Sequence, residues 1–183
     1  MRGRLFIISG CSGAGKGTLI KLLLEKNPDI KLSVSAATRA PREGEKDGIN
    51  YFFVSKEEFK RSIENNEFLE WAEFCGNYYG TKKNFVQKTL DKGIDLILEI
   101  DVQGAGQVKK KMPEAKTVFI MPPSLEVLEK RLRGRNTESE EAVLKRLSEA
   151  QREIETGKSF DYQIINDKLE DALNSLQKIF DRK

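Results

Sequence analysis

A glycine-rich segment near the N-terminus, GCSGAGKGT at residues 10–18, constrains the fold of this chain more than any other feature. It follows a short apolar run, RLFIIS at residues 4–9, and precedes LIKLLLEK, in which apolar residues recur at helical spacing. A loop of this kind between a buried strand and a helix binds phosphate, because its backbone N–H groups and the positive end of the helix face the same point. The loop fits the pattern G-x-x-x-x-G-K, whose lysine, here Lys16, reaches the β- and γ-phosphates of a nucleotide.

The loop departs from the usual pattern immediately after the lysine. A serine or threonine that binds Mg²⁺ is expected there, but this chain has Gly17, and the first hydroxyl belongs to Thr18. The form GKGT resembles that of small kinases that phosphorylate nucleoside monophosphates, so we interpret it as a variant site for ATP. The residues expected to bind ATP are Gly10, Cys11, Ser12, Gly13, Ala14, Gly15, Lys16, Gly17 and Thr18, and Thr18 is also a candidate Mg²⁺ ligand.

Three more apolar runs predict further buried strands, at residues 94–101, 117–121 and 162–166. Helical segments alternate with these runs, which favours an α/β fold whose central parallel sheet is covered on both faces. One helix is predicted from about Glu140, with Thr137 as the start of a candidate capping box. The last helix carries an apolar stripe, and Asp167 is its candidate cap.

Composition excludes several classes of protein. The 183 residues suffice for one compact domain, and a net charge of +3 is too small to indicate a nucleic-acid or membrane partner. The chain has no run of about 18 apolar residues and no signal-peptide pattern, so we expect a cytoplasmic protein. Cys11 and Cys75 are expected to be free thiols, and the oligomeric state is expected to be a monomer or a homodimer. Histidine is absent, so the chemistry depends on carboxylates, lysines, arginines and backbone dipoles.

The segment from residue 33 to residue 81 interrupts the alternation of strands and helices. It contains a helix with a capping box at Ser55 and Glu58 and short strand-like pieces rich in aromatic residues, so a β-rich insertion is predicted. Arg39 and Arg42 are spaced to form a fork for one phosphate, whereas arginines on their own are more often solvated surface residues. Three aromatic residues are expected to pack rather than to bind: Trp71, Phe74 and Tyr78.

Six blocks of the sequence resemble the guanylate kinase family and follow one another in that family's order. They are SVSAATRAPREGEKDGINYFFVS, FLEWAEFCGNYYGT, LILEIDVQG, FIMPPS, RLRGRNTESEE and INDKLEDAL. The resemblance implies a three-layer P-loop kinase that uses Mg²⁺ and transfers the γ-phosphoryl group of ATP to GMP, and also to dGMP, giving GDP and ADP. It further implies a core of about residues 1–34 and 82–183, a GMP-binding subdomain of about 35–81 and a helical lid of about 131–148.

The resemblance also assigns roles to individual residues. The phosphate of GMP would be held by Arg39, Arg42, Tyr51 and Tyr79. The guanine edge would be read by Ser35, Glu70, Thr81 and Asp101. A carboxylate such as that of Glu70 accepts hydrogen bonds only, which suits the N–H donors of guanine and not the edge of adenine.

Further assignments concern ATP and the lid. The lid arginines would be Arg131, Arg135 and Arg146, which together with Lys16 and Arg39 are the expected catalytic residues. Asn166 would lie near the base of ATP, and Glu99 would orient water around Mg²⁺. The chain departs from the family at Ala37, where Thr or Ser is frequent, and at Glu99, where Asp is frequent. Arg133, in the same basic cluster as the lid arginines, is expected to be an ordinary surface residue.

Two other functions are compatible with such a fold. One is a catalytically inactive module of the same family that binds a phosphorylated peptide, which would tolerate loss of the phosphate loop. The other is a kinase for a different monophosphate such as AMP. The intact lysine and basic cluster favour the enzyme over the module, and presenting each nucleotide with ATP and Mg²⁺ distinguishes the two kinases.

Overall fold

The computed structural model describes residues 1–134 and 139–181, and the chain folds into two compact units. The first unit contains Met1–Phe6, Asp29–Glu99 and Gln103–Ala115. The second unit contains Ile7–Pro28, Ile100–Val102 and Lys116–Lys183. Within the described part of the chain, no helix is both long enough and apolar enough to cross a membrane.

A five-stranded sheet with the order β2-β7-β1-β8-β9 confirms the predicted α/β class. Its strands are β1 (Leu5–Gly10), β2 (Lys31–Leu32), β7 (Leu96–Glu99), β8 (Lys116–Met121) and β9 (Tyr162–Ile165). Both β2 with β7 and β8 with β9 pair in parallel. Every residue of β1 is buried, as expected for a parallel strand covered on both faces.

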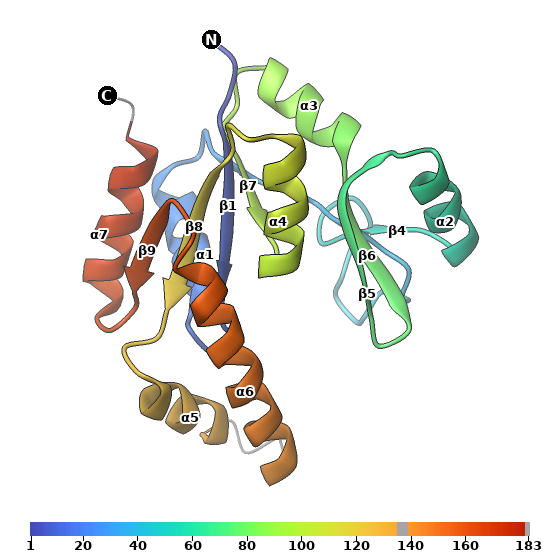
Figure 1. Ribbon diagram of the computed structural model, residues 1–183. Helices are drawn as coiled ribbons and strands as arrows, with labels where there is room; N and C mark the ends of the chain where they lie inside the picture. The colour runs from blue at the N-terminus through green and yellow to red at the C-terminus, as the bar shows by residue number, and fades with distance from the viewer. Residues whose placement is uncertain (135–138, 182–183) are drawn as a thin grey trace. The chain divides into compact units, whose positions relative to one another are not determined.

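The second unit also contains helices, which Figure 1 shows together with its strands. They are α1 (Lys16–Lys26), α5 (Leu125–Arg133), α6 (Glu140–Gly157) and α7 (Leu169–Phe180). The helix α7 packs on both β9 and α1, and α5 packs on α6. The apolar stripe of α7 explains this contact, because Leu173 and Leu176 are buried while Leu169, at its start, is 42% exposed.

The first unit contains a second sheet, with the order β4-β3-β6-β5. Its strands are β3 (Ala36–Ala37), β4 (Phe52–Phe53), β5 (Phe68–Phe74) and β6 (Asn77–Lys82), and its helices are α2 (Lys56–Glu64), α3 (Lys83–Asp91) and nearly all of α4 (Val102–Lys111). The ring of Phe59, from α2, stacks on Phe68 at 4.2 Å and on Tyr78 at 5.5 Å. Burial of such a ring stabilises the first unit by about 1.5–3 kcal/mol.

Helix caps were predicted with mixed success. The capping box at Ser55 and Glu58 is confirmed, with both reciprocal hydrogen bonds present. The predicted cap Thr137 lies outside the described residues, and the N-cap of α6 is Ser139, whose hydroxyl accepts from the N–H of Ala142. The prediction that Asp167 caps α7 was wrong. The N-cap of α7 is Lys168 and the helix begins at Leu169, whereas a cap at Asp167 would require the helix to begin at Lys168.

The three aromatic residues expected to pack do not behave alike. Trp71 and Tyr78 pack against the buried cluster of the insertion, as predicted. Phe74 does not, and its exposed fraction of 69% shows that the expectation was wrong. Phe74 pairs with Asn77 at the tip of the β5–β6 hairpin, so it lies at the end of the strand and not over the buried cluster.

Replacing Gly157 with alanine should destabilise the second unit. A Cβ atom at this position would lie 2.4 Å from the ring of Phe119, which is fully buried and packs edge-on against Phe160. We expect the free energy of unfolding to fall by about 1–3 kcal/mol, because the packed ring must shift. Urea titration followed by circular dichroism measures this change. The matched control is Gly106→Ala, where nothing lies within 4 Å of the new Cβ and a gain of about 0.5–1 kcal/mol is expected.

Candidate active site

The glycine-rich loop joins β1 to α1 in the second unit, as the sequence predicted. Gly15 has a left-handed backbone (φ 86°) and is the N-cap of α1, which begins at Lys16. A Cβ atom on Gly10 would lie 2.5 Å from the carbonyl oxygen of Ile120, so only glycine allows β1 to approach β8 so closely here. These two glycines allow the compact turn that places the start of α1 directly after the loop, and N–H groups at a helix start are a usual site for anion binding.

One face of α6 lies on this loop. Arg146 donates from Nη1 to the hydroxyl of Ser12 at 3.3 Å, and the carbonyl of Ala150 accepts from the thiol of Cys11 at 3.6 Å. Lys16 donates from Nζ to the carbonyl of Gly10 at 3.4 Å, which holds the ammonium group over the loop. The loop and the predicted lid arginine Arg146 are therefore in direct contact within one unit.

The side chain of Asn166 binds the backbone of the phosphate loop. Its amide donates to the carbonyl of Ala14 at 2.8 Å, and the residue is only 6% exposed. The backbone carbonyl of Asn166 accepts a hydrogen bond at 3.2 Å from the guanidinium of Arg131, a second predicted lid residue. The structure thus places Asn166 against the loop backbone, a contact that sequence reasoning did not anticipate for a residue assigned to the ATP base. Arg135, the third predicted lid arginine, lies outside the described residues.

Glu153, which sequence analysis did not single out, lies on the helix that contacts the phosphate loop. It lies on α6, three residues beyond Ala150 and therefore on the face that touches the loop. Burial raises the pKa of its carboxyl group, the positive charge of Lys16 acts in the opposite direction, and the carboxylates of Asp101 and Glu149 raise it further. Lys16 is thus within electrostatic range of a half-buried carboxylate. Nothing in the sequence around Glu153 distinguishes it from the other glutamates of this charged helix.

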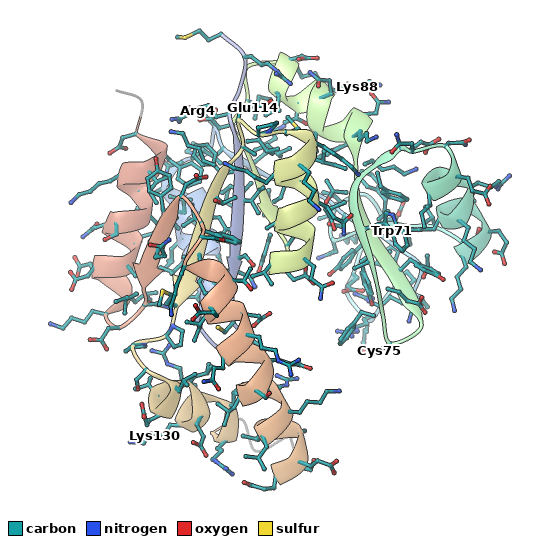
Figure 2. The ribbon with its side chains drawn as sticks, in the orientation of Figure 1. Arg4, Trp71, Cys75, Lys88, Glu114 and Lys130 are labelled. Atoms are coloured by element: carbon teal, nitrogen blue, oxygen red, sulfur yellow. The ribbon has the colours of Figure 1, made fainter. Side chains whose placement is uncertain are left out.

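Burial also raises the pKa of the Cys11 thiol to about 12, and the nearby carboxylate of Glu153 adds to the effect. Cys75, in contrast, is exposed at the tip of the β5–β6 hairpin (Figure 2). Because the thiolate is the reactive form, we expect Cys75 alone to react with a thiol reagent at pH 8 in the folded protein. Counting modified thiols by mass spectrometry checks this, with the unfolded protein expected to show both; modification of Cys11 before Cys75 would contradict it.

Arg39 lies at the centre of the cluster predicted for the phosphate of GMP. Its guanidinium is 4.9 Å from the ring centre of Tyr51, which in turn lies 6.2 Å from the ring centre of Tyr79. The fork of Arg39 is occupied by Glu45, with hydrogen bonds of 2.6 and 2.7 Å, and Glu45 also accepts from the backbone N–H of Arg42 at 2.8 Å. The structure therefore brings all four predicted phosphate residues to one place in the first unit.

Glu45 was not predicted, although it occupies the position of an anion in this cluster. Hydrogen bonding to Arg39 lowers the pKa of Glu45 to about 2, with a further contribution from the N–H of Arg42. The same pairing raises the pKa of Arg39. Both groups are therefore charged at neutral pH, and the carboxylate fills the planar fork that a phosphate would otherwise engage.

Two of the predicted guanine readers are joined by a short hydrogen bond. The hydroxyl of Thr81 donates to Glu70 at 2.6 Å, and both residues are buried. Ser35 directly precedes Ala36, which pairs with Gly80, so the sheet register places Ser35 close to Thr81. The fourth predicted reader, Asp101, belongs to the second unit and lies within electrostatic range of Glu153 there.

Thr18 and Glu99, the two candidate Mg²⁺ residues, carry oxygen atoms that suit Mg²⁺ but do not form a complete binding site by themselves. Thr18 is exposed in the first turn of α1, and Glu99 is exposed at the end of β7 in the other unit. Among the described residues, no group of three or more Cys, Asp or Glu side chains forms a metal cage. A site built from one hydroxyl, water and substrate phosphates is nevertheless usual for Mg²⁺ in kinases, because this ion keeps several waters. A side chain on Gly17 would meet nothing within 4 Å, so local packing does not explain the glycine.

A parallel α/β sheet with a phosphate loop between its first strand and helix defines a P-loop nucleotide-binding protein. Residues 2–183 match the family model described as guanylate kinase. The chain therefore belongs to the guanylate kinase family over nearly its whole length.

Individual relatives agree with this assignment. The chain is 51% identical to a guanylate kinase of Synechocystis over 98% of its own length and 94% of the relative's. It is 53% identical to a guanylate kinase of Caldanaerobacter subterraneus, with 97% and 86% of the two chains covered. Among solved structures, a guanylate kinase from Anaplasma phagocytophilum is similar, with a TM-score of 0.75, 36% identity and coverage of 97% and 84%.

Proposed function

We propose a division of roles among the residues of this chain in the reaction of its family. The chain is an ATP:GMP phosphotransferase, which transfers the γ-phosphoryl group of ATP to GMP and produces GDP and ADP. The observation that carries the proposal is the full-length family match in a chain whose phosphate loop retains Lys16. Because the acceptor phosphate is already largely ionised near neutral pH, positioning and cationic stabilisation suffice, and no histidine is needed.

GMP is bound by the first unit. Arg39 and Arg42, with the hydroxyl groups of Tyr51 and Tyr79, hold its phosphate, which displaces Glu45 from the guanidinium of Arg39. A dianionic phosphate offers more acceptor oxygens than one carboxylate, so this exchange is favourable. The guanine edge is read by Glu70, Thr81 and Ser35, and Asp101 is the fourth residue that we assign to this role. The Thr81–Glu70 hydrogen bond supports this, because it leaves the other carboxylate oxygen to accept from guanine.

ATP is bound by the loop of the second unit, residues 10–18. The backbone N–H groups hold the β-phosphate, and Lys16 approaches the γ-phosphate, where charge develops during transfer. Arg131, Arg135 and Arg146 provide further positive charge there. Two contacts support this. Arg146 donates directly to Ser12 of the loop, and Arg131 donates to Asn166, whose side chain in turn donates to the carbonyl of Ala14 in the loop.

Mg²⁺ would be held by the Thr18 hydroxyl and, through water, by Glu99, with the nucleotide phosphates as its other ligands. When bound, it would neutralise charge on the β- and γ-phosphates. We propose residues 35–81 as the GMP-binding subdomain and residues 131–148 as the lid that excludes water during transfer. We also propose that the enzyme is cytoplasmic, because its two cysteines are free thiols and its substrates are nucleotides. We expect it to be a monomer or a homodimer.

A panel of acceptors tests the function. ADP formation is measured with ATP and Mg²⁺ in the presence of GMP, dGMP, AMP, CMP or UMP. We expect turnover with GMP and dGMP only, because the buried carboxylate of Glu70 matches guanine donors. Equal turnover with AMP would contradict the base assignment, and binding of GMP without turnover would indicate the inactive module. The relatives and the solved structure named above are guanylate kinases, which supports the enzyme over either alternative.

A further inference from the structure

The strand that carries Glu70 lies at the edge of its sheet, and a helix holds that edge. β5 is the last strand in the order β4-β3-β6-β5, so within the part of the chain that the structure describes one side of its backbone has no neighbouring strand. Gln107, on α4, accepts from the N–H of Trp71 at 3.2 Å and donates to the carbonyl of the same residue at 2.9 Å. This side-chain amide therefore makes the pair of hydrogen bonds that an adjacent strand would make.

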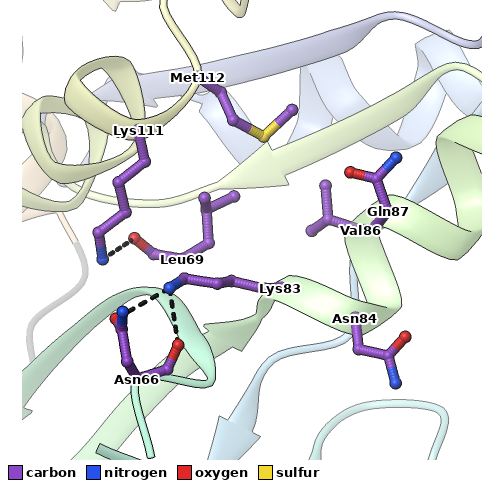
Figure 3. Close-up of a pocket in the computed structure, with 8 residues that line it drawn as sticks. All are labelled: Asn66, Leu69, Lys83, Asn84, Val86, Gln87, Lys111 and Met112. Atoms are coloured by element: carbon purple, nitrogen blue, oxygen red, sulfur yellow. Dashed lines mark hydrogen bonds between the residues drawn. The ribbon is translucent and has the colours of Figure 1, made fainter.

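Lys111 holds the same strand on the other side of Glu70. The β5–β6 register shifts between Phe68 and Glu70, since Phe68 pairs with Lys82 and Glu70 with Thr81, so Leu69 is the extra residue of a bulge. The ammonium group of Lys111 donates to the carbonyl of Leu69 at 2.8 Å and to that of Phe68 at 3.1 Å. Figure 3 shows the Lys111 ammonium directed at the Leu69 carbonyl. The lysine thus binds the backbone where the ladder is interrupted.

Gln107 and Lys111 lie one turn apart on α4 and hold residues on both sides of Glu70. The carboxylate of Glu70 is within electrostatic range of Lys111: burial and the charge of Lys83 lower the pKa of Lys111, and Glu70 acts in the opposite direction. A bulge re-aims the side chain that follows it, and here that side chain is Glu70, which is 6% exposed.

We propose that Gln107 and Lys111 are positioning residues, which clamp the bulged edge of β5 and thereby aim the Glu70 carboxylate at guanine. The inference rests on the proposed role of Glu70. It extends that role to two residues that the proposed function does not place against either nucleotide, and to a helix that follows a different strand, β7, in the chain.

The variants Lys111→Met and Gln107→Leu test the clamp. Each should raise KM for GMP by about tenfold, because the edge of β5 loses a hydrogen-bonding partner and the strand that carries Glu70 is no longer held in place. KM for ATP should stay within about twofold, since the loop belongs to the other unit. Lys111 borders a cavity of about 600 Å³, so methionine can be accommodated without overpacking.

Two controls accompany these variants. Lys111→Arg keeps a cation that can donate to both carbonyls, so it should restore most of the affinity for GMP. Lys110→Met removes the same charge from an exposed neighbouring position of α4 and should leave KM for GMP unchanged. If Lys111→Met lowered kcat/KM for GMP and for ATP equally, with a lower melting temperature, the residue would be merely structural and the proposal would be wrong.

A double-mutant cycle with Glu70→Gln separates this inference from the proposed function. If the clamp acts through Glu70, Lys111→Met should add little to the rise in KM that Glu70→Gln already causes. Additive effects of the two substitutions would overturn the clamp while leaving the guanine contact intact. An unchanged KM for GMP in Glu70→Gln alone would instead overturn the assignment of Glu70, and the clamp proposal with it.

Discussion

Lys16→Met is expected to lower kcat by about 10³-fold, the largest effect of any single substitution considered for this chain. Methionine keeps the length and the apolar stem of lysine but removes the positive charge that approaches the γ-phosphate. Charge that develops in the transition state then has no ammonium group to stabilise it. Initial rates of ADP formation at saturating GMP and ATP measure the change.

The matched control for this variant is Lys21→Met, on the exposed side of the same helix, which should turn over normally. The far-ultraviolet circular dichroism of both variants should equal that of the parent chain, because the backbone of the loop is set by Gly10 and Gly15. A kcat within a few-fold of the parent in Lys16→Met would refute the assignment of this loop to the transferred phosphate.

Arg39→Ala is expected to raise KM for GMP by about 100-fold and to leave KM for ATP nearly unchanged. The variant loses a forked, charge-assisted pair of hydrogen bonds to phosphate, and 100-fold corresponds to about 2.8 kcal/mol. It also leaves the Glu45 carboxylate without its guanidinium partner beside the phosphate site, which adds repulsion. Steady-state kinetics with each substrate varied in turn distinguish the two KM values.

Three companion variants sharpen this test. Arg39→Lys should recover only part of the affinity, because an ammonium group lacks the planar fork. Arg39→Ala combined with Glu45→Gln should bind GMP more tightly than Arg39→Ala alone, since the unpaired carboxylate is gone. Arg61→Ala removes an exposed arginine from α2 of the same unit and should have no effect. If Arg39→Ala raised both KM values equally, Arg39 would not belong to the GMP site.

The elements predicted correctly are those that depend on local sequence. The path from β1 through the loop to α1 follows from apolar periodicity and from glycines that permit a compact turn. The capping box at Ser55 and Glu58 closes within four residues, so its pattern is visible in the chain itself. The cap predicted at Asp167 was wrong, because several residues near a helix start can form a cap and packing decides where the helix begins.

The contacts that sequence reasoning missed join residues far apart in the chain. Gln107 and Trp71 are 36 positions apart, and Asn166 and Ala14 are 152 positions apart. Glu45 is only six positions from Arg39, but nothing in the local pattern distinguishes this carboxylate from others in a charged loop. Such pairings depend on which residues the folded units bring together, and they cannot be predicted from local patterns in a single sequence.

By itself, the sequence determined the class of fold, the phosphate loop and the family, because glycine spacing and strand–helix alternation depend on neighbouring residues. Only the tertiary structure decided that Glu45 occupies the fork of Arg39, that Glu153 lies within electrostatic range of Lys16, and that α4 holds the edge strand beside Glu70. The physical reason is that hydrogen bonds and charge pairs act over a few ångströms in space. Their partners are set by the packing of whole elements and not by separation along the chain.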